Sequence, residues 1–153
     1  MLSNLISTDL IFTNVVLSKK TKEEAIKKLT ELTAKVTNID KGKLEDNILE
    51  REAIATTGIG KGVAIPHGRI KGIDELKVVI MKLKDGVEWD SLDDEKVNVI
   101  IAIIMPYDYK GNLYLLLLKE FAKKLVHDEF IKKIINEDDP EDIYNFLLNE
   151  LKM

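Results

Sequence analysis

The chain has 153 residues, a length that suits one globular domain with a single hydrophobic core. A content of 45% hydrophobic and 33% charged residues is ordinary for a soluble protein, and a net charge of −4 argues against a broad nucleic-acid-binding surface. The lack of cysteine excludes disulfides and thiolate sites, and no apolar run approaches the roughly 18 residues of a membrane span. We therefore expect one cytoplasmic domain over residues 1–153, without a signal peptide or direct membrane insertion.

The chain is expected to begin with a strand and a helix. Apolar residues over Leu10–Leu17 predict the strand, and Val15–Leu17 is its firmest part. Thr21-Lys22-Glu23-Glu24 has the spacing of a capping box, which marks the start of a helix. The apolar positions that follow have helical spacing, so the helix should run to about Asn38.

A second helix is expected over Asp40–Ala55, with Asp40 as its N-cap and Gly58 closing it. Its inward face carries Leu44 and Ile48. Arg51 continues this apolar stripe, being seven residues after Leu44 and three after Ile48. An arginine there either extends past the core to solvent or points into a pocket, and the residues alone favour the first interpretation.

The two clearest strands are expected over residues 76–83 and 97–105. The second is almost continuously apolar, which is typical of a central strand covered on both faces. Residues 84–86 and 90–94 have the composition of turns, and the lone Trp89 between them is most simply a packing residue.

The last third of the chain is predicted to be helical. One helix is expected over residues 112–126, with an opening at Tyr114–Leu118 that is apolar all round and should therefore be buried. Asp128 should cap a short helix, and Asp139-Pro140 should start the last one, with the aspartate as N-cap. Helices and strands are mixed along the chain, which predicts an α/β fold in layers around one sheet.

The segment Glu52–Gly68 joins a charged stretch, a glycine-rich loop, a short apolar run and a histidine. Its loop glycines, which allow tight turns and close approach to a ligand, are Gly58, Gly60 and Gly62. Val63–Ile65 should form a short buried strand, and Pro66 fixes its own φ and keeps Ile65 extended. His67 is therefore expected on a stiff mount at the end of a strand, with little bulk around it.

His67 can act as a nucleophile because an imidazole with an ordinary pKa near 6.5 is mainly unprotonated at neutral pH. A phosphoryl group on its ring would need donors for the phosphoryl oxygens, and the loop glycines' N–H groups and the Arg51 guanidinium are suitable. Taken alone, the residues leave open a structural histidine that caps the strand end. A zinc site is not expected, because His67 and His127 are the only histidines and cysteine is absent. His127 should be an exposed residue at a helix junction.

This segment resembles the phosphorylation-site signature of IIA components of the sugar phosphotransferase system, fructose–mannitol type (type-2 EIIA domains). Glu52 occupies the acidic slot, and Ile59-Gly60 the apolar-glycine slot. Val63-Ala64-Ile65-Pro66-His67 and Gly68 match the apolar-Ala-apolar-Pro-His run and the small residue behind it. The resemblance implies a three-layer α/β/α sandwich with a small mixed sheet.

The resemblance also implies a function. His67 would accept a phosphoryl group from the histidine phosphocarrier protein and pass it to a cysteine of a IIB component, with no cofactor. A membrane IIC permease would take part only indirectly, and the IIB and IIC functions are expected on other chains. With His67 as the phosphorylated residue, Arg51 is expected in the pocket and not in solvent. The alternative is a regulatory module of the same fold, whose phosphorylation state controls which proteins it binds.

The chain departs from the family at one position. Many members carry a second histidine at the start of the late helix, in a pattern that Tyr114-Leu115-x-x-Leu118 matches best here, with Asn112 as the choice in another register. Neither tyrosine nor asparagine becomes cationic, but either can donate a hydrogen bond. Tyr114 is therefore expected beside the phosphoryl site. The other interpretation is that it is one more apolar residue in a buried helix start.

Overall fold

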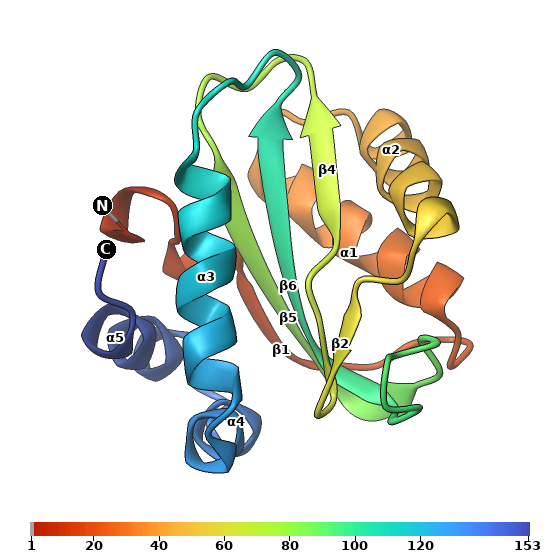
Figure 1. Ribbon diagram of the computed structural model, residues 1–153. Helices are drawn as coiled ribbons and strands as arrows, with labels where there is room; N and C mark the ends of the chain where they lie inside the picture. The colour runs from red at the N-terminus through yellow and green to blue at the C-terminus, as the bar shows by residue number, and fades with distance from the viewer. Residues whose placement is uncertain (1) are drawn as a thin grey trace.

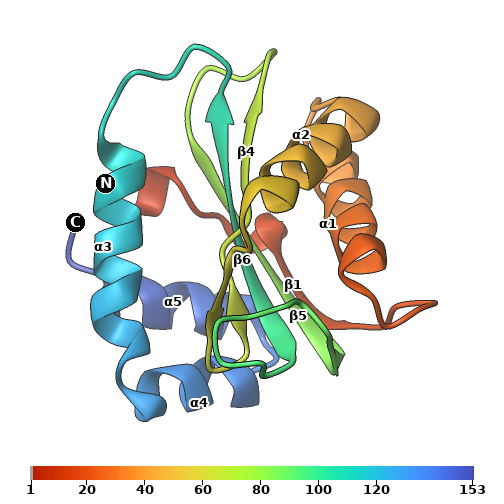
Figure 2. The same ribbon diagram turned by 45° about the vertical axis from the view of Figure 1, so that its right-hand side comes forward.

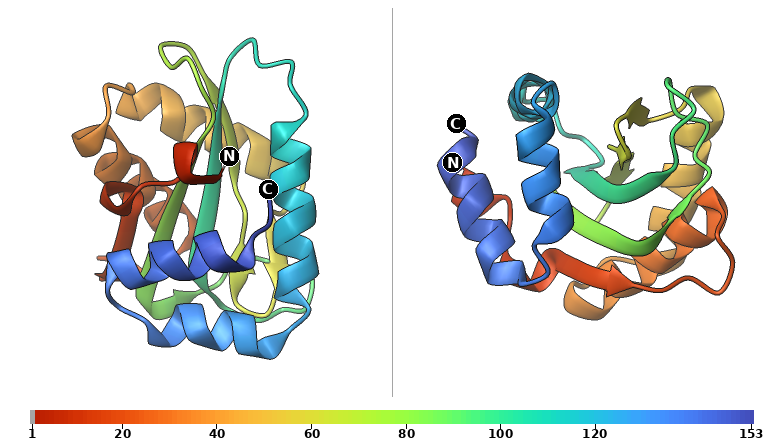
Figure 3. Two further views of the ribbon diagram at one scale, coloured as in Figure 1. Left: turned by 90° about the vertical axis from the view of Figure 1, so that its left-hand side faces the viewer. Right: turned by 90° about the horizontal axis from the view of Figure 1, so that it is seen from below.

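The computed structural model describes residues 2–153, which form helices on both faces of a central sheet. The helices are α1 (Lys22–Val36), α2 (Lys41–Ile54), α3 (Leu113–Leu125), α4 (Asp128–Asn136) and α5 (Pro140–Glu150), with short 3-10 turns at Leu2–Asn4 and Thr8–Leu10. Helices α1 and α2 cover one face of the sheet, and α3, α4 and α5 cover the other (Figures 1 and 2). The view from below in Figure 3 shows the same layers. The predicted α/β/α arrangement is confirmed.

The sheet is mixed and has six strands. The strands are β1 (Ile11–Val15), β2 (Gly58–Gly60), β3 (Val63–Ala64), β4 (His67–Ile70), β5 (Lys77–Val87) and β6 (Val97–Pro106). Their order is β1-β5-β6-β3-β2, and β4 also pairs with β6. β1 is parallel to β5, β5 is antiparallel to β6, and both β3 and β4 run parallel to β6.

Strand β6 divides the hydrophobic core into two parts, as its nearly continuous apolar sequence predicts. Ile101 and Ile103 face a core shared with α3, α4 and α5. Ile100 and Ala102, which alternate with them, face a core shared with α1 and α2. Since successive residues of a strand point to opposite faces, a strand between two helical layers must be apolar on both.

Strands β3 and β4 lie end to end along one edge of β6, and Pro66 separates them. Val63 is in register with Val99, and His67 with Ile103. Proline has no N–H to give to a ladder, so pairing is interrupted at that residue. His67 is therefore the first residue of a new strand, which corrects the prediction that it ends one.

Helix α2 packs closely against β4. A Cβ atom added at Gly68 would lie 3.1 Å from Ile48 Cγ1 and 3.2 Å from Leu44 Cδ1, so only glycine lets the helix approach this near. Both apolar side chains are fully buried, as the predicted inward face requires. This contact fixes the distance between the helix that carries Arg51 and the strand that carries His67.

The predicted starts of three helices are confirmed by their caps. The Thr21 side chain accepts a hydrogen bond from the Glu24 N–H at 3.1 Å, and Asp40 accepts one from the Lys43 N–H at 3.0 Å. Asp139 caps α5, with Pro140 in its first turn. None of the helices within residues 2–153 is long and apolar enough to cross a membrane.

Two predicted helix boundaries are wrong. Helix α2 ends at Ile54, and the extended backbone of Ala55, its C-cap, terminates it, so Gly58 does not close the helix and instead begins β2. The N-cap of α4 is His127, and Asp128 is its first helical residue. Asp128 lies in the first turn, where its carboxylate interacts favourably with the helix dipole. His127 is exposed at this junction, as expected.

The outer strands also differ from the sequence-based expectation. β1 ends at Val15, and Val16 is exposed, because Asn14 has a positive φ of 52° and the register with β5 shifts there. Residues 84–86 do not form a turn: β5 continues through them to Val87 after an irregularity that follows Lys82. Trp89, by contrast, is a buried packing residue as predicted.

The opening of α3 is not buried all round. Leu117 is fully buried, whereas Leu115 and Leu116 are 59% and 41% exposed. The helix rests on the sheet along one face only, so the side chains between the inward positions point outward. The expectation of burial is therefore wrong for Leu115 and Leu116.

Replacing Ile48 by alanine should strongly destabilise the fold, because it opens a cavity between α2 and β4. We expect a loss of about 2–5 kcal/mol in the free energy of unfolding, measured by urea denaturation. Ile54→Ala is the matched control, since the same atoms are removed from the same helix at a side chain that is 81% exposed. An equal loss in both variants would contradict the packing described for α2.

Candidate functional site

A pocket of about 280 Å³ opens beside β4, between α2 and the start of α3. The residues that line it are Asn47, Glu50, Arg51, Ile54, His67, Gly68, Arg69, Met105 and Tyr114. The pocket therefore brings together three of the predicted site residues, His67, Arg51 and Tyr114, from three separate elements. Gly68 belongs to the motif around His67, whereas the other lining residues were not singled out from the sequence, because the fold and not a motif brings them there.

His67 is half-buried in this pocket and contacts the aromatic ring of Tyr114. The two ring centroids are 5.3 Å apart, and the ring planes meet at 82°, so one ring presents its edge to the other. This is a favourable aromatic geometry. Asn112, the choice in the other register, is an exposed residue before α3 and does not line the pocket.

The surroundings of His67 keep its imidazole neutral. Burial lowers the pKa of His67 from 6.5 to about 4, and the positive charge of Arg51 acts in the same direction, whereas the negative charge of Glu52 acts in the opposite one. The ring is thus unprotonated at neutral pH, and one ring nitrogen carries a free electron pair. That is the form in which a histidine is a nucleophile.

Arg51 lies in the pocket and not along the outside of the core. Its Nη1 donates a hydrogen bond to the Ala55 carbonyl at 2.7 Å, which holds the guanidinium at the end of its own helix. A guanidinium has five N–H donors, so further donors remain for an anion. Its positive charge lies near enough to the ring to lower the pKa of His67.

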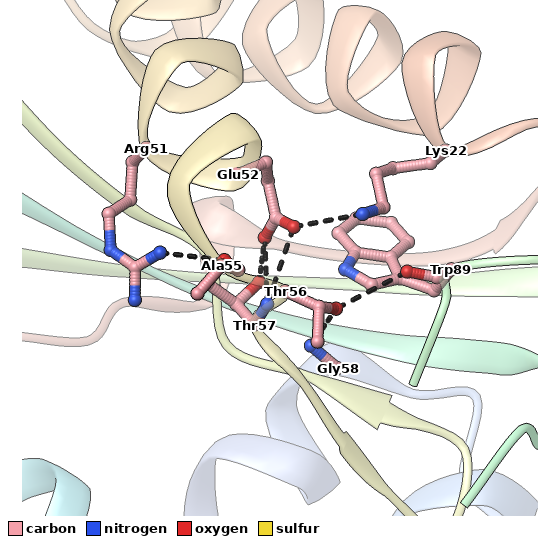
Figure 4. A network of polar contacts seen from close by, with 8 residues as sticks. All are labelled: Lys22, Arg51, Glu52, Ala55, Thr56, Thr57, Gly58 and Trp89. Atoms are coloured by element: carbon pink, nitrogen blue, oxygen red, sulfur yellow. Dashed lines mark hydrogen bonds and ion pairs between the residues drawn. The ribbon is translucent and has the colours of Figure 1, made fainter. Parts of the chain in front are cut away.

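A buried carboxylate, Glu52, ties the end of α2 to the loop behind it (Figure 4). It forms an ion pair with Lys22 at 3.0 Å and accepts hydrogen bonds from the N–H and the hydroxyl of Thr57. The Lys22 amine also lies 5.5 Å from the centroid of the Trp89 ring. Since Arg51 directly precedes Glu52, this network fixes the turn of α2 from which Arg51 projects. The sequence placed Glu52 in a motif but did not predict these partners.

The loop glycines do not line the His67 pocket. Gly58 packs where a Cβ would collide with the Ser91 hydroxyl and the Trp89 ring. Gly60 and Gly62 have φ values of 103° and 82°, and they form the hairpin between β2 and β3, where Gly62 lines a different pocket. The prediction that they bind the phosphoryl group is not supported by this placement, and the physical reason for the glycines is tight packing and turning.

Comparisons with known proteins agree on one family. The family described as "Phosphoenolpyruvate-dependent sugar phosphotransferase system, EIIA 2" matches residues 4–150. A fructose-specific EIIA component from Haloferax volcanii is 28% identical over 133 residues, 83% of this chain and 82% of that protein. A nitrogen regulatory protein from Escherichia coli is 30% identical over 131 residues, 84% of this chain and 78% of that protein.

Solved structures share the fold. The nitrogen regulatory protein IIA-Ntr from Neisseria meningitidis has a TM-score of 0.83 at 20% identity, over 95% of this chain and 98% of that one. The complex of enzyme IIAMTL and phosphorylated enzyme IIBMTL from Escherichia coli gives a TM-score of 0.74 at 20% identity, over 95% of this chain and 99% of that one.

Changing either charge beside His67 should move its pKa in opposite directions. Arg51→Gln removes a positive charge and should raise the pKa from about 4, while Glu52→Gln removes a negative charge and should lower it. Titration of the ring by NMR measures both shifts. Lys41→Gln, an exposed change in the first turn of α2, is the control and should leave the pKa where it is. An unshifted pKa in Arg51→Gln would mean that the guanidinium does not act on the ring.

The same pKa has a consequence for stability. The pKa of His67 is about 4 in the folded chain and 6.5 in the unfolded chain. The unfolded state therefore binds the extra proton first as the pH falls. The contribution of His67 therefore makes stability decrease as the pH falls through that interval.

Proposed function

The chain belongs to the EIIA 2 family of the phosphoenolpyruvate-dependent sugar phosphotransferase system, and from this premise we propose that it carries a phosphoryl group on His67. An activity of the phosphotransferase kind follows from the family. The observation that carries the residue assignment is a neutral, half-buried histidine that faces a pocket with an arginine in it. The chemistry of the pocket therefore supports His67 as the residue that carries the group.

The proposed transfer has two steps. First, the free electron pair of a His67 ring nitrogen attacks the phosphorus of a phosphohistidine on the histidine phosphocarrier protein. A new N–P bond forms as the donor's N–P bond breaks, and each ring keeps the N–H on its other nitrogen, so the donor histidine leaves as a neutral imidazole. Second, a cysteine thiolate of a IIB component attacks the phosphorus, the N–P bond at His67 breaks, and His67 returns to its neutral form.

Arg51 is proposed to bind the transferring group. A phosphoryl group has little covalent chemistry to be catalysed, so the protein contributes mainly by holding its oxygens and balancing their charge. The Arg51 guanidinium supplies a positive charge and planar donors next to the ring. Tyr114, whose ring contacts His67, is proposed to donate a neutral hydrogen bond to the same group.

The rim of the pocket suits a protein partner. Ile54 lines the pocket and is 81% exposed, and Leu115, which follows Tyr114 in α3, is 59% exposed. Large apolar side chains exposed beside a reactive group favour a docked protein surface, because the contact removes them from water. In the Escherichia coli complex, an enzyme IIA is bound to a phosphorylated enzyme IIB, which supports a IIB component as acceptor here.

A regulatory role is the second candidate. Among the relatives that match most of this chain are nitrogen regulatory proteins as well as a sugar-specific EIIA component, at similar identity. In that role, His67 would still be phosphorylated, but the phosphoryl group would change which proteins bind instead of moving on to a sugar.

One experiment separates the two roles. The phosphorylated chain is mixed with purified IIB components, and loss of the phosphoryl group from His67 is followed over time. Discharge by one IIB with appearance of its phosphocysteine supports transport. A phosphohistidine that no IIB component discharges supports the regulatory role.

His67→Ala should abolish phosphorylation without unfolding the protein, since the ring is only half-buried and fills no core position. The purified variant is incubated with phosphoenolpyruvate and the donor proteins, and phosphate incorporation is measured. His127→Ala, at the exposed start of α4, is the matched control and should be phosphorylated like the original chain. Stable phosphohistidine on His67→Ala would refute the assignment.

Tyr114 variants should test whether its hydroxyl serves the reaction. Tyr114→Phe should slow transfer modestly, because it keeps the ring contact and removes one neutral donor, worth about 0.5–1.5 kcal/mol. Tyr114→His should raise the transfer rate near pH 6, where the new ring is partly protonated and binds the phosphoryl charge more strongly. If both variants transfer at the original rate with only a lower melting temperature, Tyr114 is a packing residue.

A further inference from the structure

Asn47 lies one helical turn before Arg51 on the same face of α2, and both side chains line the His67 pocket. Asn47 is half-buried. Neither the sequence motif nor the transfer steps above give it a role. Its position next to Arg51 nevertheless puts a second side chain with hydrogen-bond donors on the wall that faces the nucleophile.

The orientation of the Asn47 amide follows from one hydrogen bond. The N–H of Arg69, on the outer edge of β4, donates to Asn47 Oδ1 at 2.7 Å. A backbone N–H can only donate, so the amide atom facing it must be the oxygen, and Nδ2 with its two N–H groups lies on the other side. Within residues 2–153, these N–H groups donate to no protein acceptor, so they are available to a ligand.

The hydrogen bond from the Arg69 N–H to Asn47 also places Asn47 relative to His67. Arg69 is two positions after His67 in the same strand, so the two residues are separated by about 6.6 Å along the strand and project to the same face. Gly68 lies between them, and a Cβ there would be 3.6 Å from Asn47 Oδ1. The bare backbone of Gly68 lets the asparagine lie against the strand beside the histidine. A group attached to the His67 ring would share the pocket with the Asn47 amide.

We propose that Asn47 donates a hydrogen bond from Nδ2 to an oxygen of the phosphoryl group on His67, an inference that rests on the phosphohistidine proposed above. A phosphoryl group presents three terminal oxygens, more than one guanidinium that already binds Ala55 can satisfy. The guanidinium of Arg69, which also lines the pocket, is held by a hydrogen bond from its Nη1 to the Tyr109 carbonyl at 3.0 Å. Asn47 is a neutral donor, so it adds a contact without adding a charge next to His67.

Two substitutions separate the donor role from the anchoring role. Asn47→Asp keeps an oxygen to accept the Arg69 N–H but replaces the donor by a negative charge. Asn47→Ala removes both. Asn145→Asp adds the same charge at an exposed position of α5 and is the matched control. Thermal melting of each variant reports whether the fold is retained.

The phosphoryl donor in this test is phosphoramidate, which needs no protein partner. The His67 ring nitrogen attacks its phosphorus, an N–P bond forms, the N–P bond of the reagent breaks, and ammonia leaves with a proton. The rate of phosphohistidine formation is measured by mass spectrometry. In parallel, the Asn47 side-chain amide signal is followed by NMR in the original chain as His67 becomes phosphorylated.

We expect Asn47→Ala to slow phosphorylation about two- to tenfold, the loss of one neutral hydrogen bond. Asn47→Asp should be slower still, because its carboxylate repels the incoming anion, and Asn145→Asp should match the original chain. The Asn47 amide signal should shift on phosphorylation. Phosphorylation of Asn47→Asp at the original rate would overturn the proposal, and it would reduce Asn47 to a residue that joins α2 to β4.

The outcome is distinguishable from a failure of the proposed relay. If phosphoramidate modifies His67 but the phosphocarrier protein does not, the relay fails while the Asn47 contact is still decided by the variants. If His67 of the original chain takes no phosphoryl group from either source, the Asn47 contact is overturned together with the relay.

Discussion

The interruption of pairing at Pro66 is the constraint on which the site depends. Pro66 has no N–H, and the Ile65 N–H turns away from β6 to donate to the Thr57 carbonyl at 3.0 Å. The Pro66 carbonyl still accepts from the Ile103 N–H at 3.0 Å, so the chain rejoins the same edge of β6 one residue later. The strand pairing with β6 therefore holds the chain both before and after Ile65-Pro66, and His67 is the first residue after this interruption.

The charges around His67 suit an anion that binds reversibly. Glu52 lies close enough to act on His67, but it is paired with Lys22 and hydrogen-bonded to Thr57. Arg51 has no carboxylate partner within hydrogen-bond distance among residues 2–153, and its one protein acceptor is the Ala55 carbonyl. The carboxylate is therefore compensated and the guanidinium is not. An empty site keeps His67 neutral, and a phosphoryl group brings the negative charge that Arg51 lacks.

The sequence predicted the parts of this site that depend on local chemistry. The caps at Thr21 and Asp40 and the burial of β6 on both faces follow from short-range patterns, so the helices and the central strand were predictable. The stripe on α2 left two positions open for Arg51 and by itself favoured solvent; only the resemblance at His67 led to the expectation that Arg51 lies in the pocket. The glycines were misassigned because their composition fits both a ligand loop and a packed hairpin. Only the tertiary fold, which puts Ser91 and Trp89 against Gly58, distinguishes the two.

Residues that only tertiary contacts bring to the pocket could not be predicted from one sequence. Asn47 has no motif around it, and its place in the pocket depends on Gly68, which lets α2 approach β4.

The apolar start of α3 shows how one pattern can serve two surfaces. A helix that rests on a sheet buries a stripe, and Leu117 and Phe121 provide it here. Leu115 and Leu116 add less to that contact, because 59% and 41% of their surface stays exposed in the folded chain. Their apolar surface gains free energy only when something else covers it, at about 25 cal/mol per Å². Leu115 directly follows Tyr114, which contacts His67, so the partner proposed above would dock beside this exposed leucine. The start of α3 is apolar all round, which is why its complete burial was wrongly predicted. Such a sequence suits a helix that packs on its own sheet with one side and would contact the proposed partner with the other.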